Sequence, residues 1–134
     1  MNDIEKSEIV ISKIVNLLMS WGIQECTMEF DELELDPEEF GGFFFPCVDW
    51  LVSEGVIRVQ DIRRYTDSNH SGFPDRPVLT SYGFQLLEQK ISVGADAERL
   101  ANRVKEVSSN GVGYANVGDL IGGILGGFTK SIGS

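Results

Sequence analysis

The sequence has few cysteines, a single histidine and no long apolar run, and each of these features excludes a class of protein. The two cysteines among the 134 residues, Cys26 and Cys47, form neither a disulfide framework nor a zinc-binding pattern, so we expect a reduced, cytoplasmic protein. No stretch of about 18 uninterrupted apolar residues is present, so no membrane-spanning helix is expected. The first residues lack a basic segment followed by an apolar run, so no secretory signal is expected either.

Positive charge is scarce, above all in the first half of the chain. Eleven Lys and Arg against twenty-one Asp and Glu give a formal net charge of -10, and no Lys or Arg occurs between Lys13 and Arg58. Eight carboxylates crowd into residues 25–39: Glu25, Glu29, Asp31, Glu32, Glu34, Asp36, Glu38 and Glu39. A surface of this kind repels nucleic-acid phosphates and anionic lipid and attracts basic proteins.

Groups able to perform catalysis are also sparse. Pairing of a nucleophile with a base needs a His or an equivalent base, and the only histidine, His70, lies in a predicted loop, where it is typical of a surface residue. The glycines around Gly111 lack the Lys and Ser/Thr of a phosphate-binding loop, and residues 31–39 lack the spacing of a calcium loop. We therefore expect no enzymatic activity, no cofactor and no metal site.

The first half of the chain predicts helices separated by an extended segment. Apolar residues at three- and four-residue spacings predict a helix over 8–21 that ends at Gly22. Residues 27–35 roughly alternate and predict a strand with a break near Asp31. Asp36 and Pro37 predict the start of a helix, with Glu39 completing a capping box. Pro46 predicts a corner, with a second helix over 46–53 that Gly55 terminates.

The second half predicts a strand over 56–65, a loop over 66–77 and a short returning strand at Val78-Leu79. Thr80 predicts the cap of a helix over 81–91. Beyond it, apolar spacing predicts helices over 95–108 and 117–132, joined by a loop over 108–116.

The order of the predicted helices, strands and loop over about residues 8–91 resembles that of a winged helix. The runs WLVSEGVIRV and PVLTSYGFQLLEQK contribute to this resemblance. The predicted fold class is therefore α+β: a winged-helix-like domain over 1–91, followed by an extension over 92–134 with two additional C-terminal helices. A winged helix implies either DNA binding or a pure interaction module.

DNA binding is the alternative function. The wing would contact DNA through Arg58, Arg63, Arg64 and Arg76. The predicted recognition helix, however, carries only carboxylates among its charged side chains, whereas contact with phosphates and base edges requires Arg or Lys.

The preferred hypothesis is a non-enzymatic module that binds a basic protein through the carboxylates of residues 25–39, with Phe43 as an apolar anchor. An immunity protein that neutralises a basic toxin or nuclease in bacteria fits the size and acidity. The simpler interpretation, in which these carboxylates are only solvated, stays open, as does the partner's identity.

Glycines four residues apart, such as Gly118 and Gly122, mark the predicted helix over 117–132. Such spacing permits close helix packing, and this helix needs a partner because each internal glycine costs about 0.5–1 kcal/mol. The candidate partners are residues 8–21, a second copy in a homodimer through the terminal helices, and lipid.

Overall fold

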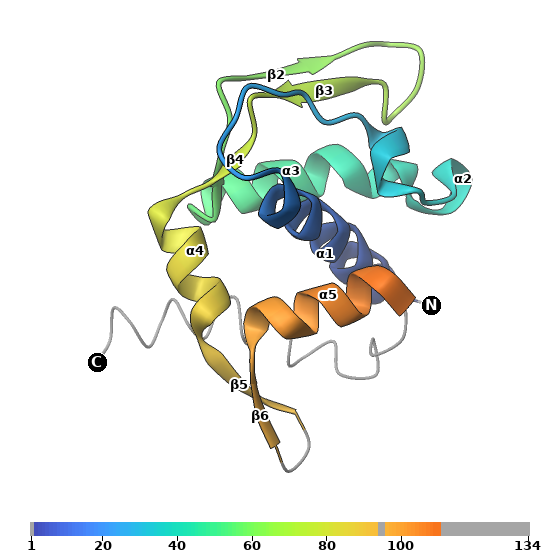
Figure 1. The fold of residues 1–134 in the computed structure, drawn as a ribbon. Coiled ribbons are helices and arrows are strands. Elements are labelled where there is room, and N and C mark those ends of the chain that lie inside the picture. Colours follow the sequence, from blue (N-terminus) through green and yellow to red (C-terminus); the bar gives the residue numbers. More distant parts are fainter. Residues whose placement is uncertain (1, 94–95, 111–134) are drawn as a thin grey trace.

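The computed structural model describes residues 2–93 and 96–110 as helices combined with short antiparallel strands (Figure 1). The helical elements are α1 (Asp3–Trp21), the 3-10 helix η1 (Phe30–Leu33), α2 (Pro37–Phe40), the 3-10 helix η2 (Gly41–Phe43), α3 (Phe44–Ser53), α4 (Ser81–Glu88) and α5 (Leu100–Asn110). The strands are β1 (Ile57–Arg58), β2 (Asp61–Arg64), β3 (Gly72–Asp75), β4 (Val78–Leu79), β5 (Lys90–Val93) and β6 (Asp96–Arg99). The predicted α+β class is confirmed.

Helix α1 has a capping residue at each end. The Asn2 side chain accepts a hydrogen bond from the Glu5 N–H at 2.8 Å, so the helix begins earlier than predicted. At the other end Gly22 adopts φ +71°, and its N–H donates to the Leu18 carbonyl at 3.0 Å. The predicted stop at Gly22 is confirmed, because a positive φ favours glycine.

The segment from α2 to α3 confirms the predicted pair of helices, but the break between them lies at η2 and not at the predicted Pro46. The Asp36 carboxylate accepts a hydrogen bond from the Glu38 N–H at 3.3 Å, and Pro37 occupies the first helical position. The second helix starts at Phe44, two positions before the predicted Pro46. Pro46 is tolerated there because it lies in the first turn, where a backbone N–H has no partner within the helix.

Strands β1 to β4 form one antiparallel ribbon of constant register. Ile57 pairs with Leu79 and Arg64 pairs with Gly72, and the pairs between them keep the same offset. The ribbon is interrupted where Val59 and Gln60 face Arg76 and Pro77, because Pro77 has no N–H and Arg76 adopts φ +52°. The single predicted strand over 56–65 is therefore two strands.

The predicted strand over 27–35 is wrong except at its start. Thr27 forms an isolated bridge with Asp75, and the Arg76 N–H donates to the Cys26 carbonyl at 2.8 Å. The chain then turns into η1, because Phe30 and Leu33 are three residues apart and both are buried. That spacing matches one turn of a 3-10 helix, whereas a strand would point these two residues to opposite faces.

Three further boundaries differ from the prediction. Residues 72–75 form β3, although Gly72 and Pro74 favoured a loop. Helix α4 ends at Glu88, before the predicted 91. Residues 96–99 form β6, the partner of β5, and a helix follows only from Leu100. Helix α5 continues to Asn110, so residues 108–110 of the predicted loop over 108–116 are helical. The rest of that loop and the predicted helix over 117–132 lie outside the described residues.

The core is built around α1, which packs against α3 and α5 (Figure 1). Its buried side chains include Ile14 and Leu18, and α3 contributes Phe44 and Leu51. Helix α5 adds a buried stripe of Leu100, Ala101, Val104 and Val107. Within residues 2–93 and 96–110, no helix has both the length and the apolar character needed to cross a membrane.

Candidate functional site

The structure places seven of the eight predicted carboxylates on two short helical segments and the turns beside them. Glu29 precedes η1, which carries Asp31 and Glu32; Glu34 and Asp36 lie in the turn that follows; and α2 carries Glu38 and Glu39. All seven side chains are exposed. This set is called the acidic end below. In Figure 1 it lies beside the N-terminal end of α3.

The carboxylates of the acidic end form no ion pair with any residue that the structure describes. The exposed acidic groups that do form ion pairs lie elsewhere, for example Glu88 with Arg99 at 3.1 Å. The mutual repulsion of the seven carboxylates of the acidic end is therefore not relieved by neighbouring Lys or Arg side chains of the described residues. A basic partner would supply the missing positive charge.

Buried apolar side chains hold the acidic end in place. Phe30 and Leu33 of η1 are 2% and 1% exposed, so the carboxylates between them are directed to the solvent. The Glu32 carboxylate accepts a hydrogen bond from the Glu29 N–H at 3.0 Å, which closes a capping box. Glu34 adopts φ +56°, a conformation uncommon for a residue other than glycine.

The loop over residues 65–71 folds back onto this end of the molecule (Figure 1). The ring of His70 lies 5.0 Å from the ring of Phe30, centroid to centroid. The loop is closed by a 3.0 Å hydrogen bond from the Tyr65 N–H to the Ser71 carbonyl. The loop thus brings its own side chains beside those of η1.

Between the loop and η1 lies a hollow of about 230 Å³. Its lining includes three carboxylates, those of Glu29, Asp31 and Asp67, together with Tyr65 and His70. We call this set the acidic hollow. Neither Tyr65 nor Asp67 was among the predicted binding residues, and only the fold-back of the loop brings them to η1. The one signal in the sequence was an aromatic residue at the end of a strand, just before a polar loop.

The aromatic residues near the acidic end are mostly core residues. Phe40, Phe44 and Phe45 are buried, and Phe43, the predicted anchor, is half-buried and packs against the core. Tyr65 is 52% exposed, with its ring edge-on to Phe73 at 6.4 Å. Tyr65 is therefore the large aromatic side chain that the structure offers to a partner beside the carboxylates.

Glu25 lies apart from the acidic end, on the segment between α1 and η1. Its carboxylate lies 3.5 Å from the Arg76 guanidinium. The other arginines of the ribbon differ in their surroundings. Arg63 lies 3.6 Å from Asp61, and the Arg64 guanidinium lies 4.6 Å from the centre of the Phe45 ring. Arg58 is exposed and forms no ion pair with a described residue.

The exposed side of the α2–α3 segment carries no positive charge. Glu39, Gly42, Pro46, Asp49 and Ser53 recur at helical spacing and are all exposed. This is the side that a DNA-binding helix would direct to the major groove.

The surroundings of both thiols raise their pKa values. Burial raises the pKa of Cys47 to about 12, and its Sγ lies 3.7 Å from the Ser7 carbonyl oxygen. Partial burial raises the pKa of Cys26 as well, assisted by the negative charges of Glu32 and Asp75. A thiol that stays protonated is a poor nucleophile. Within the described residues, no group of three or more His, Cys, Asp or Glu side chains is placed to hold a metal ion.

Comparison of the chain with protein-family models, with curated proteins and with solved structures found no match.

Proposed function

We propose that this chain is a non-enzymatic module that binds a basic protein through the acidic end and the acidic hollow. The observation that carries the proposal is that seven exposed carboxylates, on two short helices and the turns beside them, form no ion pair with described residues. Immunity or inhibitor activity against a basic toxin or nuclease fits this surface, because carboxylates can occupy a cationic groove in place of substrate phosphates.

The acidic hollow suits an arginine or lysine side chain of the partner. The carboxylates of Glu29, Asp31 and Asp67 supply hydrogen-bond acceptors, and the ring of Tyr65 supplies an apolar contact at the rim. Tyr and Arg are enriched among the few residues that provide most of the binding energy in protein interfaces. Such an inhibitor would act in the cytoplasm, where it protects the nucleic acids of the cell that makes the toxin.

The test begins with capture of a basic protein from the native cell by the full-length chain. Association should slow about tenfold or more when salt is raised to about 0.5 M, because screening removes electrostatic steering. The triple variant Glu29→Gln, Asp31→Asn, Asp67→Asn should dissociate faster from the captured protein.

A variant of equal net charge provides the control. Asp3→Asn, Glu5→Gln and Glu54→Gln remove the same number of charges outside the acidic end and the acidic hollow. Near-native dissociation is expected for this control, with association slowed only by its smaller net charge. Equal dissociation rates for the two triple variants would overturn the assignment of the acidic hollow. Capture of a basic protein at a rate insensitive to salt would overturn the electrostatic mechanism.

DNA binding by a winged-helix-like domain is the second candidate. The order of α1, the bridge at Thr27, α2, α3 and the β1–β4 ribbon favours it, because a winged helix has this order. Its weakness is that Arg63, Arg64 and Arg76 each contact a side chain of the same molecule. A mobility shift on pooled genomic fragments at low salt, lost in Arg63→Ala plus Arg64→Ala, would support it.

Self-association through terminal helices stays a prediction. Residues 8–21, one of the candidate partners for residues 117–132, belong to α1, and α1 already packs against α5. Sedimentation of the full-length protein beside a version ending at Asn116 tests it: a dimer that becomes a monomer on truncation is the expected result, and equal masses would contradict it.

A further inference from the structure

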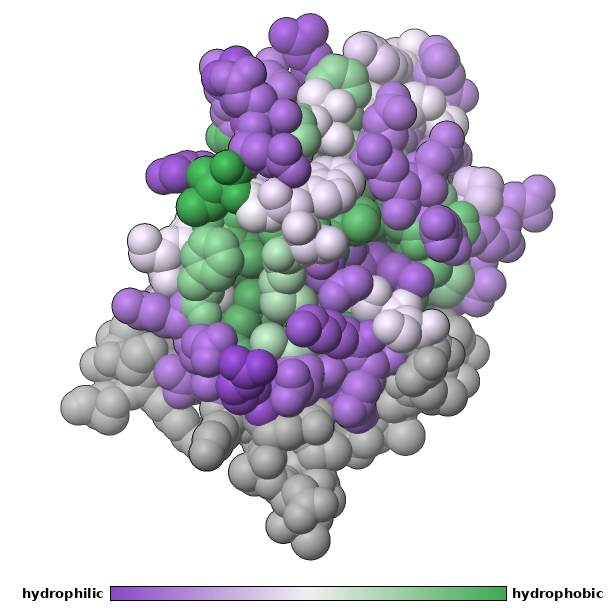
Figure 2. Space-filling view, in the orientation of Figure 1, coloured by the Kyte–Doolittle hydropathy of each residue, from purple (hydrophilic) through white to green (hydrophobic). Residues whose placement is uncertain are grey.

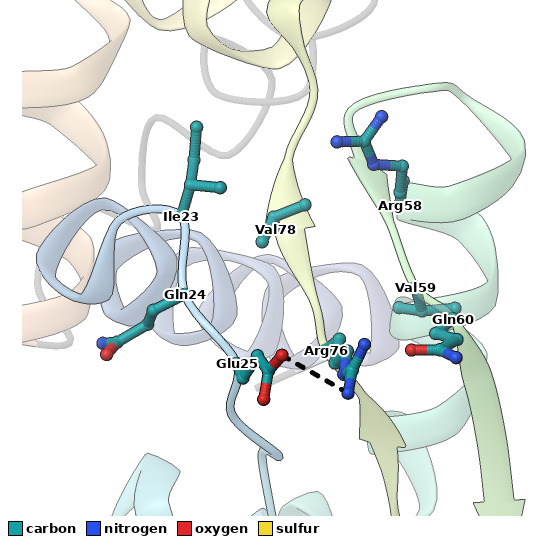
Figure 3. A pocket seen from close by; sticks show the side chains of 8 residues that line it. All are labelled: Ile23, Gln24, Glu25, Arg58, Val59, Gln60, Arg76 and Val78. Carbon is teal, nitrogen blue, oxygen red and sulfur yellow. Dashed lines mark ion pairs between the residues drawn. The ribbon is translucent and has the colours of Figure 1, made fainter.

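A second hollow, of about 440 Å³, lies away from the acidic end, between the segment after α1 and the ribbon (Figure 3). One wall is formed by residues 23–25 and the other by residues 58–60, and Val78 of β4 lies between them. We call it the arginine trough. It lies where the ribbon is interrupted, and it stays open because residues 23–25 form no bridge with the ribbon, whereas Thr27 does.

The trough combines an apolar lining with positive charge. Ile23, Val59 and Val78 supply the apolar surface, and Ile23 is 73% exposed. In Figure 2 apolar side chains gather on the drawn face, below the hydrophilic ribbon and over α4 and the end of α1. An apolar area of this kind beside a cavity is typical of a binding surface.

The two guanidinium groups of the trough differ in their surroundings. Arg76 shares its charge with Glu25 at 3.5 Å, in an ion pair that joins the wall of residues 23–25 to the segment leading into β4. Arg58 extends from the opposite wall and forms no ion pair with a described residue. With Glu25 counted, the trough carries one net positive charge on a protein whose formal net charge is -10.

We propose that the arginine trough binds an acidic peptide segment of a protein partner, with a carboxylate on Arg58 and a neighbouring aliphatic side chain against Val78 and Ile23. The guanidinium of Arg58 can bind a carboxylate through two parallel hydrogen bonds. Glu25 competes with the ligand for Arg76, so it weakens binding. This site is separate from the acidic end, and it requires a ligand of opposite charge.

The apolar lining favours a peptide over nucleic acid. A phosphodiester backbone offers charge and polar sugar atoms but no aliphatic group to place against Ile23 and Val78. Glu25, on one wall of the trough, also repels the repeated phosphates of a nucleic acid. A peptide can instead place a single carboxylate on Arg58.

The test uses ¹⁵N-labelled full-length protein and three capped peptides. Acetyl-Thr-Val-Asp-Val-Thr-amide should shift the backbone amides of Arg58, Val59 and Val78. Replacing its Asp by Asn should weaken binding about threefold or more, because the carboxylate on Arg58 is lost. Replacing both Val by Ser should weaken binding to a similar extent, because the aliphatic contact with Val78 and Ile23 is lost. A short oligothymidylate tests nucleic-acid binding at the same amides, and it should bind more weakly than the acidic peptide.

Variants at the trough separate the two arginines. Arg58→Gln should weaken binding of the acidic peptide about two- to fivefold, and Glu25→Gln should strengthen it, since Arg76 is released. Arg63→Gln, on the same ribbon but outside the trough, is the matched control and should bind like the native protein. Equal binding of the Asp and Asn peptides would overturn the proposal, as would tighter binding of oligothymidylate at these amides. Neither result bears on capture of a basic protein by the acidic hollow.

Discussion

The Nδ1 atom of His70 lies 2.7 Å from the position that a β-carbon on Gly41 would occupy. The two residues can therefore lie this close only because Gly41 has no side chain. Because His70 contacts Gly41 so closely, the loop over residues 65–71 packs against η2. Tyr65 and Asp67 of this loop therefore lie beside η1. The acidic hollow thus depends on a glycine that does not line it.

Gly41→Ala should displace the loop without unfolding the protein. Gly41 has helical dihedral angles, φ -55° and ψ -40°, so alanine gains about 1 kcal/mol of helix propensity, which offsets much of the clash. Amide hydrogen exchange over residues 66–71 should accelerate while the melting temperature changes little. Gly42→Ala is the control, because its β-carbon would meet only the flexible Asn69 side chain at 3.2 Å. Unchanged exchange in Gly41→Ala would contradict this role for the glycine.

Arg64→Ala should destabilise the fold more than Arg63→Ala, although both remove one positive charge from β2. The Arg64 guanidinium lies over the ring of buried Phe45, a contact worth about 0.5–1 kcal/mol. Arg63 forms an exposed ion pair with Asp61, and such pairs contribute little. Urea unfolding of the two variants checks the order, and equal free energies of unfolding would argue against the cation–π contact.

Thr80→Ala should lower the free energy of unfolding by about 1–2 kcal/mol. The Thr80 hydroxyl accepts a hydrogen bond from the Gly83 N–H at 2.9 Å and donates to the Gly55 carbonyl at 2.5 Å, with the Val56 carbonyl at 3.1 Å. It therefore joins the start of α4 to the turn after α3. Thermal unfolding beside Thr66→Ala, at an exposed loop position, measures the effect, and similar losses in the two variants would contradict it.

The buried thiol of Cys47 should make stability fall at high pH. Its pKa is about 12 in the folded protein against 9.0 for the free group, so above pH 9 the unfolded chain loses this proton first. The resulting loss approaches about 1.4 kcal/mol per pH unit and is absent below the unfolded pKa.

Comparison with Cys47→Ala isolates this effect. The free energy of unfolding of the native protein minus that of the variant should decrease between about pH 8 and about pH 10.5. A difference that stays constant over this interval would show that the thiol ionises equally in both states. Thiol labelling offers a second measure, because Cys26 should react before Cys47 in the folded protein.

Local signals predicted the ends of elements well. Gly22, Asp36 and Thr80 act through hydrogen bonds to residues two to four positions away, so the sequence around them is sufficient. The failures share a different cause. Phe30 alternates with Met28, and Leu33 with Leu35, as in a strand. Only burial of both Phe30 and Leu33 beneath the carboxylates selects the 3-10 turn.

The candidate site was predictable in its charge and unpredictable in its shape. The crowding of carboxylates over residues 25–39 is visible in the sequence, but Glu25 lies with Arg76, apart from the rest. Asp67 and Tyr65 reach η1 only through contacts between residues far apart in the chain, such as that of Phe30 with His70. Hydrophobic periodicity contains no information about such contacts.

The packing of α1 against α5 also has a consequence for synthesis of the protein. The ribosome makes α1 first, whereas α5, which covers part of its apolar surface, is the last described helix to emerge. Until then the part of the α1 surface that α5 covers stays exposed on the nascent chain. Folding therefore finishes after translation of α5, and a stalled or truncated chain is the form most exposed to chaperones and proteases.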